Sequence, residues 1–347
     1  MNKNVKNRIE WVDCAKGLAI ILVVYGHALT YYSPNFDSIV HVIYSFHMPL
    51  FFALTGYVSA YSYESEDFFV FYKRKNITLM KPYFLYAVVL LAFKVLKTCL
   101  LGNALSGGNI NRIINTILIT RKSFISELWF LPCLLIAHCL MFFVAKRKTI
   151  FSWMSVTLCF GVALLLRNTF NIALPCNLDN ALLALPFIFG GVQWRIVAME
   201  DNKKRIQRYC RFLVALIVFT GVNLLEITQG YSVDYFADIL IGNVPFFIFT
   251  ATTGTAIIIL TSQFVTGCKN RFVKNCLMKC GQNSLSIYGF HYVVLALVYQ
   301  VLKMFRSEAM GAQLILIIIE TGIVIALILL SKELLTNWNR IKKEKKQ

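Results

Sequence analysis

The sequence predicts an all-α integral membrane protein, a bundle of about ten transmembrane helices with both termini in the cytoplasm. Three observations lead to this fold class. Of the 347 residues, 58% are apolar and 15% are charged, against roughly 45–50% and about 25% in a soluble domain. The polar residues come in islands, and the apolar runs between them have roughly the 20 residues that cross a bilayer core. Most of the basic residues fall on one side of the resulting topology.

Ten apolar runs are the expected spans. They cover residues 14–32, 38–61, 78–101, 127–146, 150–167, 180–198, 211–227, 238–263, 283–303 and 312–335. The first run has no small-residue cleavage site after it, so we interpret it as a retained span and not as a signal peptide. The segment 102–126 is expected to be the longest outer loop. We expect residues 1–347 to form a single transmembrane domain.

The basic residues give the orientation. The net charge of +18 comes from 35 Lys and Arg against 17 Asp and Glu. With the N-terminus inside and ten spans, most of the Lys and Arg lie on the cytoplasmic side, which is the usual bias in membrane proteins. We interpret the excess charge as a topology signal, which removes nucleic acid as a partner. The expected location is the cell (inner or plasma) membrane.

Ionisable side chains inside a membrane are costly, so each is a candidate functional residue. All five histidines of the chain lie in the expected spans: His27, His41, His47, His138 and His291. Lys16 and His27 are about three helical turns apart and point the same way, and Asp13 lies roughly 40° from that line. One stripe of the first span therefore carries an acid, a base and an imidazole. The ten cysteines are not spaced as metal ligands, so we expect no metal site.

The depth of these side chains suggests their roles. Asp13 is about 21 Å from His27 along the helix axis, too far to orient the imidazole. We expect Asp13 to pair with Lys16 or to meet a cytoplasmic ligand. Glu127 begins the fourth span at a depth similar to that of His27, and we expect it to orient the imidazole. The other candidates for that role are His41 and Asp37.

Two further segments have unusual composition. In the second span, Pro49 and Gly56 predict a kinked or broken helix, with His47 just before the break. On the cytoplasmic side, a basic cluster precedes the third span. Positive-inside topology accounts for such residues, and the functional interpretation is an anion site for a phosphorylated donor. The cluster consists of Lys73, Arg74, Lys75 and Lys81.

Four segments together resemble a known family. They are RIEWVDCAKGLAIILVVYGH at 8–27, FHMPLFFALTGY at 46–57, LWFLPCLL at 128–135 and GQNSLSIYGFH at 281–291. In this order and spacing they resemble the membrane-bound acyltransferase-3 family, and within it the fucose 4-O-acetylase-like and polysaccharide O-acetyltransferase branch. The resemblance implies transfer of an acyl group, usually acetyl, from cytoplasmic acyl-CoA to a hydroxyl of an outward-facing glycan.

The resemblance also implies roles for single residues. Catalysis is expected of His27, as general base or acyl carrier, with Lys16 and Glu127. The family often has a further Arg shortly before the Pro of the third span, and here Lys81 stands in its place. Donor binding is expected of Lys73, Arg74, Lys75, Lys81 and Asp13. Acceptor binding is expected of Trp129, His47, Tyr288 and His291, and Ser284 matches the serine of the last motif.

Acetyl-CoA (or another acyl-CoA) is expected as a co-substrate, with no permanently bound cofactor. The other expected partners are a surface glycan or lipid-linked oligosaccharide and membrane lipid. The chemistry could differ within the same fold, with a succinyl donor or a peptide, lipid or small-molecule acceptor. A proton-coupled transporter or flippase is an alternative from another class, since buried His and Lys residues also form proton relays. A purely structural subunit would leave the stripe of Lys16 and His27 unexplained. Acetyl-CoA turnover by the purified protein separates enzyme from transporter.

Overall fold

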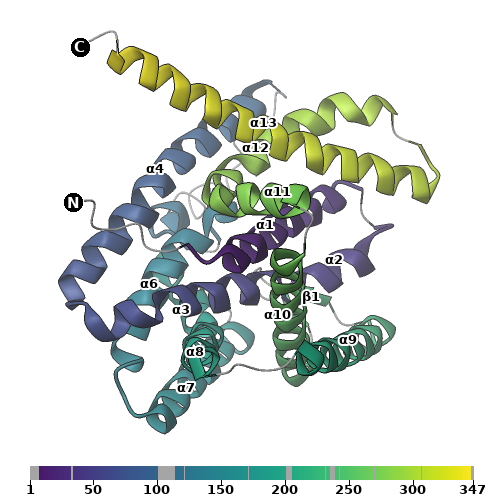
Figure 1. The fold of residues 1–347 in the computed structure, drawn as a ribbon. Coiled ribbons are helices and arrows are strands. Elements are labelled where there is room, and N and C mark those ends of the chain that lie inside the picture. The colour runs from purple at the N-terminus through teal and green to yellow at the C-terminus, as the bar shows by residue number, and fades with distance from the viewer. Residues whose placement is uncertain are drawn as a thin grey trace. The chain divides into compact units, whose positions relative to one another are not determined.

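The computed structural model describes residues 8–344 except 33, 101–113, 121, 171, 201–204, 231, 235–238, 242, 269–270 and 306. Residues 102–113 of the expected outer loop therefore lie outside the described residues. Helices dominate the described chain (Figure 1). The long ones are α1 (Glu10–Thr30), α2 (Asp37–Tyr44), α3 (His47–Ser65), α4 (Phe68–Leu100), α6 (Phe130–Val144), α7 (Thr149–Asn168), α8 (Leu178–Glu200), α9 (Arg205–Thr228), α10 (Val244–Gly267), α11 (Arg271–Gln282), α12 (Ser284–Leu302) and α13 (Met310–Glu344).

Short elements connect these helices. They are the 3-10 turns η1 (Ser126–Leu128), η2 (Pro175–Asn177) and η3 (Lys303–Phe305), and the strands β1 (Ser232–Asp234) and β2 (Ile239–Ile241). The two strands pair antiparallel, with Val233 opposite Leu240. Apart from this short hairpin the described chain contains no sheet, and the all-α prediction is confirmed.

Ten helical segments of the described chain are long and apolar enough to cross a membrane, which confirms the expected number of spans. They differ in how far the protein covers them. In the most apolar window of α1, 67% of the residues are buried, whereas in α9 the share is 17%. Large apolar side chains such as Ile217 on α9 are therefore exposed, as expected for helices that face lipid. The orientation of the termini stays a prediction.

Two expected details of the spans are wrong. The third helix begins at Phe68 and not near residue 78, because the basic cluster interrupts the apolar run without interrupting the helix. In the second span the helix stops at Tyr44 and starts again at His47, so the break precedes His47. Pro49 lies in the first turn of α3, where a backbone N–H has no helical partner to lose.

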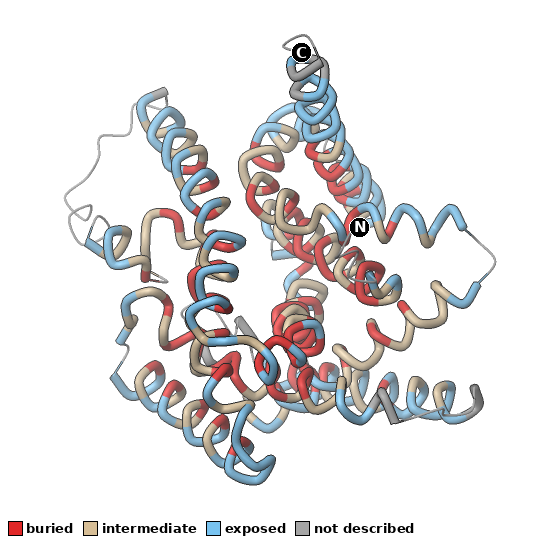
Figure 2. The backbone as a smooth tube through the Cα atoms, turned by 60° about the vertical axis from the view of Figure 1, so that its left-hand side comes forward, coloured by how far each residue is buried: buried red, intermediate tan, exposed pale blue. Residues whose placement is uncertain are grey.

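The contacts divide the chain into two compact units. Unit 1 comprises Met1–His47, Cys210–Tyr231 and Asn243–Gln347, and unit 2 comprises Met48–Tyr209 and Ser232–Gly242. Figure 2 shows buried stretches along much of the backbone. Each unit has its own buried apolar side chains, for example Ile20 and Val24 of α1 in unit 1 and Phe52 of α3 in unit 2. The expectation of a single domain over 1–347 stays a prediction.

Glycines bring helices of unit 1 into backbone contact. A Cβ atom at Gly17 of α1 would collide with the carbonyl oxygen of Leu277 in α11. A Cβ atom at Gly281 would collide with the carbonyl oxygen of Asp13. Small residues allow such close approach between membrane helices. They hold α11 directly against the N-terminal half of α1.

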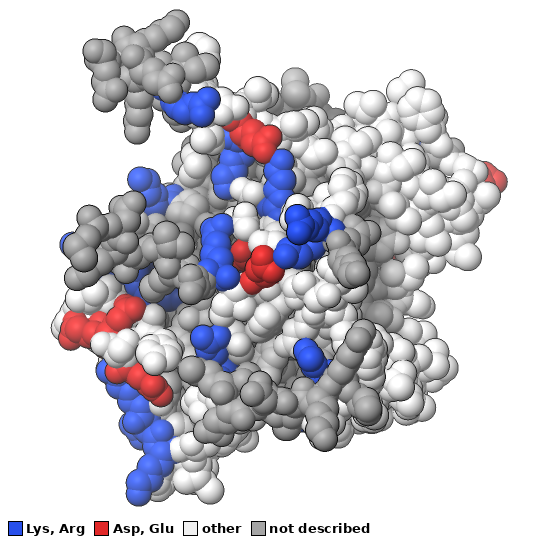
Figure 3. Space-filling model, in the orientation of Figure 1, with Lys and Arg blue, Asp and Glu red and all other residues white. Residues whose placement is uncertain are grey.

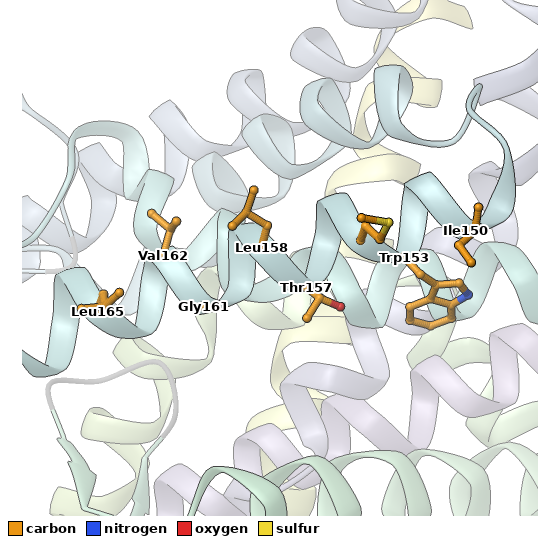
Figure 4. A pocket seen from close by; sticks show the side chains of 8 residues that line it. Ile150, Trp153, Thr157, Leu158, Gly161, Val162 and Leu165 are labelled. Carbon is orange, nitrogen blue, oxygen red and sulfur yellow. The ribbon is translucent and has the colours of Figure 1, made fainter.

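Unit 2 has a comparable contact between α3 and α8. A Cβ atom at Gly56 would collide with the carbonyl oxygen of Ile188, and one at Gly191 with that of Ala53. Gly56 thus serves helix packing, and α3 continues through it. On α7 an open groove of about 740 Å³ runs from Ile150 to Leu165 (Figure 4). Its lining is almost entirely apolar, so it suits hydrocarbon and not a polar substrate.

Candidate functional site

Four side chains of unit 1 form what we call the histidine cluster: His27, Tyr44, His47 and His291. The last turn of α1 places His27 beside α2 and α12. Its Nδ1 lies 3.4 Å from the hydroxyl of Tyr44, and its ring centroid lies 5.1 Å from that of His291. The ring of Tyr44 lies 4.9 Å from that of His47. Histidines from three helices are thus linked in one cluster, with His27 between Tyr44 and His291 and with His47 against Tyr44.

Backbone carbonyls fix the tautomers of two of these histidines. Nδ1 of His47 lies 3.0 Å from the carbonyl oxygen of Ile43, and Nδ1 of His291 lies 2.7 Å from that of Tyr288. A carbonyl only accepts, so both Nδ1 atoms carry a proton, and in the neutral ring Nε2 is then the acceptor. The hydroxyl of Tyr44 both donates and accepts, so it is compatible with either tautomer of His27.

Tyr288 belongs to the same region. Its ring centroid lies 6.1 Å from that of His291, and its carbonyl oxygen accepts the hydrogen bond described above. Both residues lie on α12, which begins at Ser284. The hydroxyl of Ser284 is not part of a hydrogen bond among the described side chains, whereas Ser286 accepts a hydrogen bond from Lys332 over 3.0 Å. The last motif thus places His291 in the histidine cluster and Tyr288 next to His291.

The other end of α1 is polar. The carboxylate of Asp13 accepts a hydrogen bond from the Gln282 side chain over 3.2 Å, and Glu10 pairs with Lys274 of α11 over 2.8 Å. Lys16 is half-buried on the same helix, between this end and the histidine cluster. Also on α11, a hydrogen bond with Glu333 raises the pKa of Lys279.

In unit 2, Lys75 turns inward. Its ammonium donates to the hydroxyl of Ser59 over 2.9 Å and lies 3.0 Å from Nε2 of His138. Nδ1 of His138 lies 2.6 Å from the hydroxyl of Tyr63. Since the ammonium only donates, Nε2 of His138 accepts, and Nδ1–H of the neutral ring donates to Tyr63. We call these four side chains the lysine–histidine relay.

The rest of the basic cluster is more exposed. Arg74 forms a two-pronged ion pair with Glu66, at 2.7 and 2.8 Å, and donates to the hydroxyl of Ser62. Lys73 and Lys81 are exposed on α4. On the face drawn in Figure 3, charged side chains form separate groups on a largely uncharged surface. The predicted donor residues of α4 therefore divide into one half-buried member, Lys75, and three exposed ones.

The two acceptor-side candidates of unit 2 lie at the start of α6. Both carboxylate oxygens of Glu127 accept hydrogen bonds from Lys94, at 2.7 and 2.8 Å. Lys94 also donates to the carbonyl of Phe124. The indole of Trp129 lies 6.4 Å from the ring of Phe52, centroid to centroid. Sequence reasoning did not anticipate Lys94 as the partner of Glu127.

Two other buried pairings were missed. His41 of α2 lies 3.3 Å from a carboxylate oxygen of Glu226 in α9, and His138 joins the relay described above. The available signal was the presence of these polar residues inside apolar spans. Among the described residues, no group of three or more His, Cys, Asp or Glu side chains is arranged to hold a metal ion. All ten cysteines, each of them described, are unpaired.

The fold and the site define a multi-pass membrane protein with a cluster of histidines inside its spans. Residues 9–331 match the acyltransferase-3 family, described as an acyltransferase domain. The match covers nearly the whole chain, so the chain belongs to this family and is a membrane acyltransferase.

One curated relative matches a short segment. Nodulation protein NolL of Mesorhizobium japonicum is 45% identical over 64 residues, which is 16% of this chain and 16% of that protein. The chain thus spans far less than two thirds of this relative's length. No solved structure matches the chain.

Proposed function

We propose that this acyltransferase moves an acetyl group from cytoplasmic acetyl-CoA to a hydroxyl of an outward-facing glycan at the cell membrane. The observation that carries the proposal is the histidine cluster, in which the imidazole of His27 lies 5.1 Å from that of His291 and 3.4 Å from the hydroxyl of Tyr44. Placing an ionisable side chain inside a span costs several kcal/mol, so such a residue is by default a candidate for function. Among the described residues, nothing is hydrogen-bonded to Nε2 of His27.

Two chemical routes use that nitrogen. As a general base, Nε2 takes the proton of the glycan hydroxyl while the oxygen attacks the thioester carbonyl, and the C–S bond breaks to release the CoA thiolate. As a nucleophile, Nε2 attacks the thioester first, and the resulting acyl-imidazole then passes its acetyl group to the hydroxyl. In both routes the hydroxyl proton ends on the CoA thiol. Tyr44 supports either route by holding Nδ1.

The polar end of α1 fits the donor. Lys16 lies about 16 Å from His27 along the helix axis. The pantetheine arm of CoA can cross this distance while the phosphates of CoA stay on the cytoplasmic side. Lys73 and Lys81 are exposed cations on α4, and Arg74 holds a carboxylate where it would hold a phosphate. We assign Lys75 to donor binding through the lysine–histidine relay. Asp13 is assigned to it through its hydrogen bond with Gln282, which orders the polar end of α1.

Each unit, taken by itself, contributes candidates for acceptor binding. We assign acceptor contacts to His47, Tyr288 and His291 in unit 1 and to Trp129 in unit 2, whose indole suits a sugar face. Glu127 has its charge balanced by Lys94, yet a carboxylate has about four lone-pair sites, so it keeps acceptor capacity. We keep for Glu127 the proposed catalytic role of a carboxylate that makes a base more basic.

The test uses purified protein in lipid nanodiscs with acetyl-CoA labelled in the acetyl group. Transfer of label to a glycan acceptor, lost in His27→Ala and retained in the exposed-site control Tyr61→Phe, supports the proposal. Release of free CoA without an acceptor, together with an acetyl adduct on His27 by mass spectrometry, would select the nucleophilic route. Absence of any acetyl-CoA turnover by the wild type would favour a transporter.

A further inference from the structure

We infer that His41, Asn223 and Glu226 form a sugar subsite that binds hydroxyl groups of the acceptor, with His41 one helical turn from Tyr44, the tyrosine that contacts His27. This inference rests on the proposed function. The three side chains come from α2 and α9 of unit 1, and none of them has a role in the proposed chemistry. All three are buried, with exposed fractions of 7%, 3% and 0%.

The composition of α9 makes these residues conspicuous. Most of this helix faces outward, and side chains such as Leu224 and Leu225 are exposed. Only three of its described residues are buried: Ala215, Asn223 and Glu226. Two of the three are polar, and they lie one turn apart on the same face. A helix that needs only apolar packing has no use for a buried carboxylate and a buried amide.

Their hydrogen bonds are incomplete. Nε2 of His41 lies 3.3 Å from Oε2 of Glu226, and the amide nitrogen of Asn223 donates to the carbonyl of Phe219 on its own helix. Three buried atoms have no hydrogen-bond partner among the described residues: Nδ1 of His41, Oε1 of Glu226 and Oδ1 of Asn223. Leaving buried polar atoms unpaired is costly, so their presence indicates a ligand that completes them.

The chemistry of the three atoms selects the ligand. With Nε2–H donating to Glu226, Nδ1 of a neutral His41 is an acceptor, and so are the two side-chain oxygens. A ligand must therefore bring several donors. Hard cations prefer an all-oxygen set and do not use a neutral imidazole. A sugar brings several hydroxyl donors on one rigid ring, and each can also accept.

The position matches an acceptor that reacts at His27. His41 and Tyr44 are three residues apart on α2, so they lie on one side of the helix with a rise of about 4.5 Å between them. The hydroxyl of Tyr44 is the one that contacts Nδ1 of His27. Phe219, one turn before Asn223, packs edge to face on Phe46 at 5.4 Å, so the turn of α9 next to the three polar side chains is apolar.

The experiment measures sugar binding and transfer separately. Full-length protein in nanodiscs is heated with a panel of methyl glycosides (glucoside, galactoside, fucoside and N-acetylglucosaminide) and no acyl-CoA. The variants are Glu226→Gln and Asn223→Leu, and the matched control is Leu224→Ala, whose side chain is exposed on the same helix. Turnover is then measured with acetyl-CoA and the glycoside that binds.

At least one glycoside should raise the Tm of the wild type, because a ligand that binds only the folded state stabilises it. Glu226→Gln should raise the acceptor KM about tenfold or more and Asn223→Leu about fivefold, the usual loss for a charged and a neutral hydrogen bond. The KM for acetyl-CoA should stay constant. Asn223→Leu should also raise the Tm of the unliganded protein, because it removes an unpaired buried oxygen.

A merely structural role predicts the opposite pattern. Both variants would then lower the unliganded Tm and leave the acceptor KM unchanged. That result, or a panel in which no glycoside shifts the wild-type Tm, overturns the inference. A glycoside that binds through Glu226 but is never acetylated would keep the subsite and refute the proposed transfer. Acetylation of a glycoside with an unchanged acceptor KM in both variants would refute the subsite and keep the proposed transfer.

Discussion

Each unit places a histidine inside a span, and the imidazoles of His27 and His138 are held in different ways. In unit 2, His138 has both ring nitrogens in short contacts, 2.6 Å to Tyr63 and 3.0 Å to Lys75. In unit 1, the contact between Nδ1 of His27 and Tyr44 is 3.4 Å long, and its other neighbours are rings. A histidine with both nitrogens occupied ties helices together, whereas one with a nitrogen to spare can take a proton or an acyl group.

The largest effect is expected for His27→Ala. Removal of the general base or nucleophile should lower kcat by about 10²- to 10⁴-fold, with the Tm nearly unchanged. Acetyl transfer by purified protein and thermal unfolding of the same sample test this. Transfer at the wild-type rate in this variant would show that His27 takes no part in the reaction, and the functional difference between His27 and His138 would then be refuted.

The reverse pattern is expected for His138→Ala. The change removes one short contact from the ammonium of Lys75 and one from the hydroxyl of Tyr63, at a cost of about 2–4 kcal/mol. The Tm should drop by several degrees while kcat per folded molecule stays within about twofold. His138→Gln, which can still accept a hydrogen bond, should recover part of the Tm. A variant with normal Tm and lost activity would place the relay in the reaction.

A smaller effect is expected for Tyr44→Phe. A hydrogen bond of 3.4 Å is weak, so its loss should lower kcat about threefold to tenfold, with both KM values unchanged. Tyr61→Phe, at an exposed position, is the matched control. An equal drop in both variants would mean that the Tyr44 hydroxyl does not position His27.

The smallest effect is expected at the exposed end of α4. Glu66→Gln frees the guanidinium of Arg74, whose side chain is 42% exposed in its ion pair. Such pairs are worth up to about 1 kcal/mol, so the KM for acetyl-CoA should fall about threefold when phosphate no longer competes with Glu66. Arg74→Ala should abolish the gain in the double variant. An unchanged KM in Glu66→Gln would mean that the ion pair of Arg74 and Glu66 is structural only.

The sequence allowed the spans to be predicted, because apolar runs of bilayer length depend only on local composition. It misplaced the start of the third helix at the basic cluster, since charge lowers hydropathy without weakening helix propensity. Pro49 and Gly56 predict a break in the second span after His47, whereas a proline in the first turn fits a helix and α3 continues through Gly56. Local patterns therefore gave the elements and missed two of their ends.

The partners of the polar side chains could not be predicted. His27 meets His291, and Lys75 meets His138, across more than sixty residues of chain. Such pairs depend on the rotation of each helix about its axis, which an apolar run does not specify. The family motifs singled out His291, which lies against His27, but no pattern indicated that Glu226 lies against His41.

The glycine contacts between α1 and α11 have a consequence for divergence among relatives. Gly17 and Gly281 each face a carbonyl oxygen of the other helix, so no rotamer change can absorb a larger residue there. Substitutions at most positions of α1 are open to compensation by a neighbouring side chain, but these two are not, because the obstacle is main chain. A deep mutational scan should therefore find glycines, beside the ionisable residues, among the least replaceable positions of the first span, and they can serve as fixed points when remote relatives are aligned.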